Sequence, residues 1–244
     1  MTFPMPAFSP THPEAATAPF SAVKLLLGFN GTNLATTTTD ESASPHTCTY
    51  SGTARIETAQ QKFGTASHRP GTSANGALTV TYASDLNLGT LASDAFTIEA
   101  FLRTTSISGN HYIIRQYGST ASDGAWYLTV FSGVLTFVKR NTAGSIVTVS
   151  ESVTLVSGTW HYITISKNSA GKFRLRFDGV MVANATPADA TINPSVLALS
   201  IGNLPGSNVT NTNDYIDEIR ITKDYDLYDT DADIAVPTAA FPRS

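Results

Sequence analysis

The stretch Phe96-Thr-Ile-Glu-Ala-Phe-Leu-Arg103 alternates in character from one residue to the next, and this alternation decides the class of fold. One side of an extended chain would carry four apolar side chains, those of Phe96, Ile98, Ala100 and Leu102. The other side would carry Thr97, Glu99, Phe101 and Arg103. Successive side chains of a β-strand point to opposite faces, so the pattern predicts a strand with one face against a core.

The chain continues in the same manner on both sides of this stretch. Alternation or short apolar runs predict further strands at residues 23–29, 77–82, 111–115, 125–131, 134–138, 146–149, 160–166, 173–177, 180–182, 197–201 and 215–221. The links Ser132-Gly133 and Asp178-Gly179 are typical of two-residue β-hairpins. No segment of about 10 residues or more reads as a helix. The sequence therefore predicts an all-β fold, built as an antiparallel sandwich of two sheets.

Length and composition limit the classes of protein to consider. With 244 residues, the chain is long enough for one sandwich domain with a sizeable core. A net charge of -4 and the lack of a Lys or Arg block argue against a nucleic-acid partner. Cys48 is the only cysteine, so neither a disulfide framework nor a cysteine-based zinc site is expected. We read no apolar run of roughly 18 residues and no secretory signal, and we expect synthesis in the cytoplasm without membrane insertion.

Residues 1–22 differ from the rest of the chain because they are rich in proline. Proline fixes φ and lacks a backbone donor, so a helix is excluded and an extended arm is favoured by Pro4, Pro6, Pro10, Pro13 and Pro19. Two interpretations stay open: a disordered tail, or an arm that contacts a capsid protein or a neighbouring subunit through Phe3, Phe8 and Phe20. The predicted organisation is an extended arm over residues 1–22 and one sandwich domain over residues 23–244.

Several segments, taken in order, resemble a known family. They are Leu25-Leu-Leu-Gly-Phe-Asn-Gly31, Asp40-Glu-Ser42, Ile56-Glu-Thr-Ala-Gln-Gln-Lys-Phe-Gly64, Phe96-Thr-Ile-Glu99, Gly158-Thr-Trp-His-Tyr-Ile163, Phe177-Asp-Gly179, Tyr215-Ile-Asp-Glu-Ile-Arg-Ile-Thr222 and Pro237-Thr-Ala-Ala-Phe-Pro242. Together they resemble the concanavalin A-like, laminin-G-like domains of tailed-bacteriophage virion proteins. The resemblance covers residues 23–242 and implies a jelly-roll sandwich. Two positions depart from the pattern: residue 30 is Asn where Asp is frequent, and the residue before Tyr228 is not the frequent Arg.

The resemblance also implies roles for some polar residues. Domains of this kind often hold calcium at one rim through carboxylate and carbonyl oxygens, which suit that ion. Asp40 and Asp217 occupy matching positions, and Asn30 could contribute a carbonyl, although solvated or capping side chains are the alternative. No cofactor is required for folding. Glu99 and Arg220 are expected to form a partly buried ion pair that fixes the register of two strands.

From the resemblance we expect a structural virion protein of a tailed bacteriophage, made in the bacterial host cytoplasm and located in the virion. The preferred interpretation is a capsid decoration protein that stabilises the head surface. Its partners would be the major capsid protein or other virion proteins, and it would form a homo-oligomer, with a trimer as the expected state. The alternative is a tail-associated carbohydrate-binding module, whose partner would be a cell-surface glycan of the host.

Aromatic residues near the loop-prone stretch Gly118–Gly124 are the candidates for a glycan site. A sugar site needs exposed rings with polar groups nearby. Trp126, Tyr127 and Tyr117 are the predicted glycan-binding residues, and Tyr112 lies near them in the sequence. The alternative for each ring is packing within a strand.

Catalysis is not expected. A retaining glycosidase needs two carboxyl groups about 5–5.5 Å apart on one face of a cleft. The closest cluster is Asp214-Tyr-Ile-Asp-Glu218, in which strict alternation would point the adjacent Asp217 and Glu218 to opposite faces. The histidines are scattered, and neither a nucleophile elbow nor a phosphate loop occurs.

Overall fold

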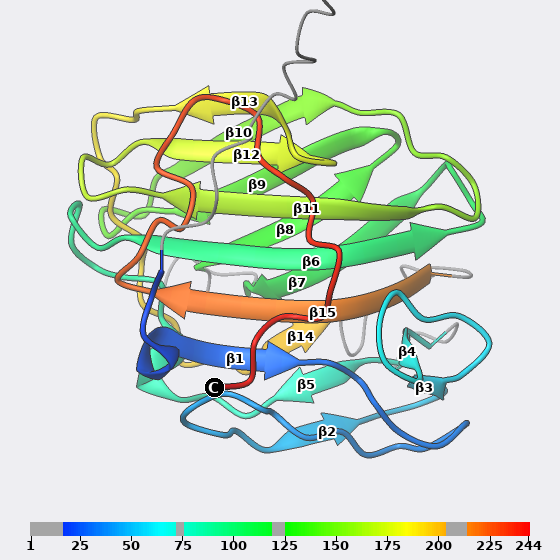
Figure 1. Ribbon diagram of the computed structural model, residues 1–244. Helices are drawn as coiled ribbons and strands as arrows, with labels where there is room; N and C mark the ends of the chain where they lie inside the picture. Colours follow the sequence, from blue (N-terminus) through cyan, green and yellow to red (C-terminus); the bar gives the residue numbers. More distant parts are fainter. Residues whose placement is uncertain (1–16, 72–75, 119–124, 204–213) are drawn as a thin grey trace, which may run out of the picture.

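A computed structural model describes residues 17–71, 76–118, 125–203 and 214–244, and it shows two antiparallel sheets packed face to face (Figure 1). The strands are β1 (Val23–Leu27), β2 (Cys48–Tyr50), β3 (Arg55–Glu57), β4 (Ser67–Arg69), β5 (Leu78–Val80), β6 (Phe96–Thr104), β7 (Asn110–Gln116), β8 (Trp126–Phe131), β9 (Val134–Arg140), β10 (Ile146–Ser152), β11 (Trp160–Lys167), β12 (Phe173–Phe177), β13 (Val180–Ala185), β14 (Leu199–Ile201) and β15 (Asp214–Lys223). Two short 3-10 turns, η1 (Phe20–Ala22) and η2 (Ser84–Leu86), are the helical elements of the described chain. The predicted all-β jelly-roll sandwich is confirmed.

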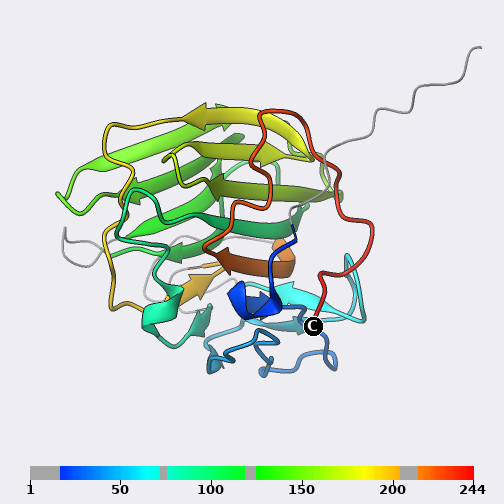
Figure 2. The same ribbon diagram turned by 60° about the vertical axis from the view of Figure 1, so that its left-hand side comes forward.

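The two layers are separated clearly in the rotated view (Figure 2). One sheet has eight strands in the order β13-β12-β11-β6-β15-β4-β3, with β1 paired to β15. The other has seven strands in the order β10-β9-β8-β7-β14-β5-β2. No helix among the described residues has the length and apolar character that crossing a membrane requires.

The main core lies between the sheets, and β6 shows why these residues form a strand. Phe96, Ile98, Ala100 and Leu102 are fully buried in this core, as the alternation predicts. Burial of each large apolar side chain contributes about 1.5–3 kcal/mol, so the facing apolar rows are the main source of stability.

The outer face of the eight-stranded sheet is also buried, which the alternation does not predict. The segment after β15 runs up over β6, β11 and β12 and returns to β1, as the red trace shows (Figure 1). We call residues 224–244 the C-terminal strap. It forms a second apolar cluster with the sheet, made of Val23, Leu26, Phe101, Tyr162, Leu227, Tyr228, Ile234 and Phe241. Phe101, on the more polar side of its strand, is therefore also fully buried.

The predicted turns agree with the structure, whereas three of the shortest strands do not follow from the sequence. Ser132 and Gly133 have φ values of 47° and 79°, and Asp178 and Gly179 have 51° and 82°. Two consecutive positive φ angles define the hairpin turn whose twist matches that of the flanking strands. The sequence predicts none of β2, β3 and β4, because no alternation or apolar run extends beyond these three-residue strands, as it does at 77–82 around β5 and at 197–201 around β14.

Candidate functional site

The predicted calcium residues hold backbone amides in the structure. Asp40 is buried, and its Oδ1 accepts hydrogen bonds of 3.0 Å from the amides of both Leu26 and Ser42. Its Oδ2 accepts from the His46 amide at 2.9 Å and lies 2.7 Å from His46 Nδ1. Through these hydrogen bonds the Asp40 carboxylate fixes the loop that follows β1. This is the capping role that the sequence left open as the alternative to calcium binding.

Asp217 and Asn30 act in the same way. Asp217 Oδ2 accepts from the amides of Lys62 at 2.8 Å and Phe63 at 3.1 Å, and burial raises the pKa of Asp217 to about 7. Asn30 Oδ1 accepts from the Thr65 amide at 2.8 Å. Among the described residues, no group of three or more His, Cys, Asp or Glu side chains could hold a metal ion. Calcium at Asn30, Asp40 and Asp217 stays a prediction.

The expectation that Asp217 and Glu218 point to opposite faces is wrong. The register between β15 and β6 shifts between Asp217 and Arg220, and Glu218 has a φ of 50°. This β-bulge interrupts the alternation, because an extra residue of β15 stands opposite the partner strand. Both carboxylates are buried: Asp217 accepts from the amides of Lys62 and Phe63, and Glu218 pairs with Arg243 of the strap at 2.6 Å. They therefore serve the fold and do not form an open catalytic pair.

The predicted pair of Glu99 and Arg220 is confirmed. These residues are register partners on β6 and β15, with 2.5 Å between Arg220 Nη2 and Glu99 Oε2. Tyr162 and Tyr228 donate their hydroxyl protons to Glu99 Oε1 over 2.5 and 2.8 Å. We call these four side chains the Glu99 network; it joins the sheet to the strap.

The structure corrects the prediction for Trp126. Its side chain is fully buried in the main core, and its ring centroid lies 6.3 Å from that of Phe137. Trp126, Leu128 and Val130 alternate along β8 and all face inward, so a sugar outside the sandwich cannot reach the Trp126 ring.

The other two predicted glycan residues lie together on the outer face of the seven-stranded sheet. Tyr127 follows Trp126 and points outward, and its ring meets that of Tyr117 edge to face, with centroids 5.1 Å apart. They line an open cavity of about 410 Å³, which we call the tyrosine pocket. Its lining residues are Tyr112, Arg115, Tyr117, Tyr127, Thr129, Phe131 and Thr136.

A bulge in β7 assembles one side of this pocket. The register between β7 and β8 shifts between Tyr112 and Ile114, so that Ile113 and Ile114 both enter the core. Strict alternation would place Tyr112 and Arg115 on opposite faces, and the extra residue brings them to the same one. The Arg115 guanidinium lies 5.5 Å from the centre of the Tyr112 ring. Sequence reasoning missed Arg115 for this reason.

Phe131 was also missed, although a signal for it existed. It shares the outward parity of Tyr127 and Thr129 and stands directly before the Ser132-Gly133 turn. Phe131 is the last residue of β8, and its side chain is 55% exposed. An exposed ring at the rim adds apolar contact area to the pocket.

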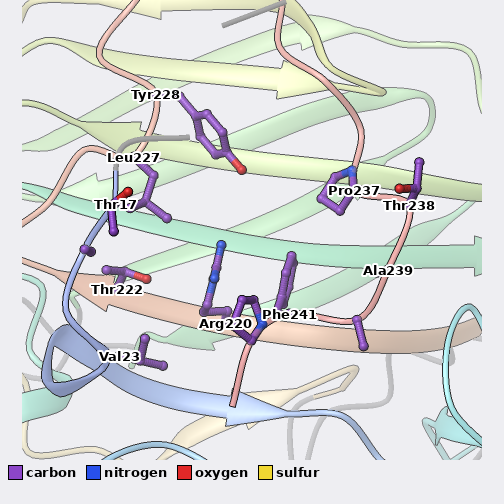
Figure 3. A pocket seen from close by; sticks show the side chains of 13 residues that line it. Thr17, Val23, Arg220, Thr222, Leu227, Tyr228, Pro237, Thr238, Ala239 and Phe241 are labelled. Atoms are coloured by element: carbon purple, nitrogen blue, oxygen red, sulfur yellow. The ribbon is translucent and has the colours of Figure 1, made fainter. Parts of the chain in front are cut away.

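A second cavity lies on the opposite side of the molecule, between β1, β15 and the strap, with a volume of about 460 Å³. We call it the strap groove. Figure 3 shows the Arg220 side chain beside the Phe241 ring at its floor, and the guanidinium is 4.3 Å from the ring centre. Arg220 is already paired with Glu99, so the groove offers mainly apolar surface from Val23, Leu227, Pro237 and Phe241.

The first described residues of the N-terminal segment border this groove. Thr17 and Ala18 line it, and Figure 3 shows Thr17 on the side of Leu227 and Thr222. Phe20 begins the turn η1 and packs, half-buried, against the second apolar cluster of its own chain. The chain therefore enters a turn before residue 23 and is not extended through residue 22 as predicted. Phe3 and Phe8 lie outside the described residues, and a contact of Phe3, Phe8 or Phe20 with another subunit stays a prediction.

Comparison with solved structures finds the same fold in bacterial toxin proteins. The binding domain of Paraclostridial Mosquitocidal Protein 1 superposes with a TM-score of 0.66 at 15% identity, over 88% of this chain and 50% of that chain. The botulinum neurotoxin serotype C1 binding domain has a TM-score of 0.62 at 17% identity, over 83% of this chain and 49% of that chain. The receptor binding domain of botulinum neurotoxin D has a TM-score of 0.64 at 14% identity, over 83% of this chain and 49% of that chain.

At these identities the likeness concerns the fold alone, and the chain spans about half the length of these structures. No curated protein is significantly similar to it. The model of the concanavalin A-like lectin/glucanases superfamily, of the laminin G type, matches residues 75–225. This match covers more than half of the chain, including β6, β11, β12 and all of β15. The chain therefore belongs to the concanavalin A-like lectin/glucanases superfamily.

Proposed function

We propose that this protein is a carbohydrate-binding module without catalytic activity, and that the tyrosine pocket is its binding site. One observation carries the proposal: three tyrosines, an arginine and an exposed phenylalanine converge on an open cavity in the outer face of the seven-stranded sheet. Large rings with a polar end combine an apolar face for the C–H groups of a sugar with a hydroxyl for its polar groups.

The polar groups around the rings suit a ligand that carries many hydroxyls. Thr129 and Thr136 are register partners that line the pocket; the buried Thr129 hydroxyl donates to the His111 carbonyl oxygen at 3.0 Å, and the Thr136 side chain is partly exposed. Arg140 donates to the Tyr117 hydroxyl at 3.0 Å and so holds this ring in position. A site that is positioned before the ligand arrives loses less side-chain entropy on binding.

The same lining favours binding over cleavage. Glycoside hydrolysis needs two carboxyl groups beside the scissile bond. None of the described residues that line the tyrosine pocket carries a carboxyl group. The solved structures similar to this chain are binding domains by name, which agrees with a binding role.

For the biological setting, we propose the virion of a tailed bacteriophage, because the segments that resemble virion proteins extend along nearly the whole domain. In that setting the ligand would be a cell-surface glycan of the bacterial host, and the domain would act in adsorption.

Substitution of Tyr127 by alanine tests the site. We expect the affinity for glycans to fall by about tenfold or more, as is typical when a central aromatic anchor is removed. A glycan array probed with the full chain identifies ligands, and titration calorimetry measures the loss. Tyr215 is a matched control, because it is a partly exposed tyrosine on the other sheet, and Tyr215→Ala should bind as the original does. Equal affinities of Tyr127→Ala and the original chain would refute the site.

A second candidate function is supported by the strap groove. The described chain begins at the rim of an apolar groove lined by Pro237 and Phe241, and the sixteen residues before it contain Phe3, Phe8 and four prolines. We propose that in a homo-oligomer, as in a capsid decoration protein, residues 1–16 of one copy dock in the strap groove of the next. Proline-rich segments dock on aromatic and apolar surfaces at a small loss of entropy, because their conformation is restricted in advance.

Deletion of residues 1–16 tests this second function. We expect the deleted protein to lose its oligomeric state and its occupancy on particles, because the arm supplies the contact. Its melting temperature as an isolated domain should stay the same, since η1 and Phe20 are kept. Light scattering gives the mass, and quantitative gel analysis of particles gives the occupancy. Unchanged mass and occupancy would reject the role of the arm.

A further inference from the structure

We infer that the tyrosine pocket selects acidic saccharides, in which a carboxylate or sulfate on the sugar pairs with Arg115. This inference rests on the proposed function and adds the chemical class of the ligand. It follows from the charges at the pocket, from the unused donors of Arg115 and from the groups that surround it.

Two arginines of this region lack a counter-ion in the described chain. Arg115 lines the pocket, and Arg140 donates a hydrogen bond to the Tyr117 hydroxyl. Neither forms an ion pair with a described residue, whereas Arg174, Arg220 and Arg243 all pair with carboxylates. The protein as a whole carries a net charge of -4, so carboxylates are available elsewhere on it. The lack of one here leaves a local positive charge on a negatively charged protein.

The hydrogen bonds of Arg115 leave most of its donors without a partner among the described residues. A guanidinium carries five N–H groups. Arg115 donates from Nη2 to the Tyr117 carbonyl oxygen at 2.7 Å, and its buried Nε has no partner among the described residues. Burial among the tyrosine rings lowers the pKa of Arg115, because the charged form loses solvation. A partly desolvated cation without a counter-ion is unfavourable, and an anionic ligand would remove that penalty.

The described groups facing Arg115 come from both neighbouring strands, and none of these described groups is acidic. Its register partners are Tyr127 on β8 and Ser200 on β14. Tyr112 on the same strand and Tyr117, directly after that strand, flank Arg115. Asp123 is the nearest acidic residue in the sequence, and it lies outside the described residues. Arginine binds carboxylate and sulfate oxygens through paired N–H groups, and a lysine cannot reproduce this planar geometry.

An array in which each oligosaccharide core is present in neutral, carboxylated and sulfated forms tests the inference. We expect the full chain to bind acidic forms about tenfold to hundredfold more tightly than the neutral form, as befits one charge-assisted contact. Arg115→Gln should remove this preference, and Arg115→Lys should restore only part of it. A higher salt concentration should weaken the binding of acidic forms more than the binding of neutral forms. The relative binding of carboxylated and sulfated forms identifies which anion the pocket accepts.

Arg103→Gln provides the matched control, because Arg103 also lies against a tyrosine ring, that of Tyr215, but on the opposite sheet. Arg103→Gln changes the net charge by the same amount as Arg115→Gln, and this variant should keep the preference for acidic forms. Thermal melting shows whether each variant is folded. If Arg115→Gln is unstable, Arg140→Gln gives a second test. We expect Arg140→Gln to weaken the preference for acidic forms. Equal binding of neutral and acidic forms, or a preference unaffected by either substitution, would overturn the inference and leave the proposed function in place. Binding of no glycan at all would instead refute the proposed function.

Discussion

Replacement of Glu99 by alanine is expected to lower the free energy of unfolding by about 3–5 kcal/mol, which is the effect of removing one partner from a buried ion pair. Glu99 is fully buried, and the side chain of Arg220 is only 12% exposed. Without the carboxylate, the Arg220 charge is left unpaired, and the hydroxyl groups of Tyr162 and Tyr228 lose their acceptor. Urea unfolding followed by tyrosine and tryptophan fluorescence measures the change.

Glu57→Ala is the matched control for this substitution. Glu57 also pairs with arginines, but the side chains of Arg55 and Arg69 are 28% and 24% exposed, so water can solvate their charges. We expect Glu57→Ala to lower the free energy of unfolding by up to about 1 kcal/mol. A loss of similar size for both substitutions would contradict the central role of the Glu99 network.

Replacement of Trp126 by alanine is expected to destabilise the protein by about 3–5 kcal/mol, because it removes a large ring from a closely packed core. Trp126 is fully buried, and its indole nitrogen has no partner among the described residues, so the loss comes from packing. Urea unfolding measures the change. Glycan affinity per folded molecule should be unchanged, because the ring is on the other side of the sheet from the tyrosine pocket.

Trp160→Ala serves for comparison, because Trp160 is only partly buried at the start of β11 and packs at the edge of the second apolar cluster. Trp160→Ala should lower the free energy of unfolding by less than Trp126→Ala does. A Trp126→Ala variant that kept its stability but lost glycan binding would reverse our interpretation and return Trp126 to the glycan site.

The contrast between Trp126 and Tyr127 shows how far sequence reasoning reaches at the site. Neighbouring residues of a strand point to opposite faces, so both rings could not line one pocket. The inward partners of Trp126 are Leu128 and Val130, and the outward partners of Tyr127 are Thr129 and Phe131. The alternation along β8 therefore held the information needed to separate the two rings. Choosing aromatic residues by their nearness to a loop did not use it.

The sequence by itself determined the long strands, the two hairpins and the sandwich, because these depend on local alternation and turn residues. These features repeat every two residues or close within a few, so a short window of sequence contains their cause.

Only the tertiary structure decided which side chains meet at the sites. The bulges that join Tyr112 to Arg115 and Asp217 to Glu218 shift the parity of a strand by one residue. Each bulge depends on pairing with the partner strand. The sequence of the bulged strand alone therefore does not determine where the bulge lies. The strap likewise buries Phe101 through Phe241, a residue distant in sequence. Contacts of this kind arise when separate segments pack together, and no local pattern specifies them.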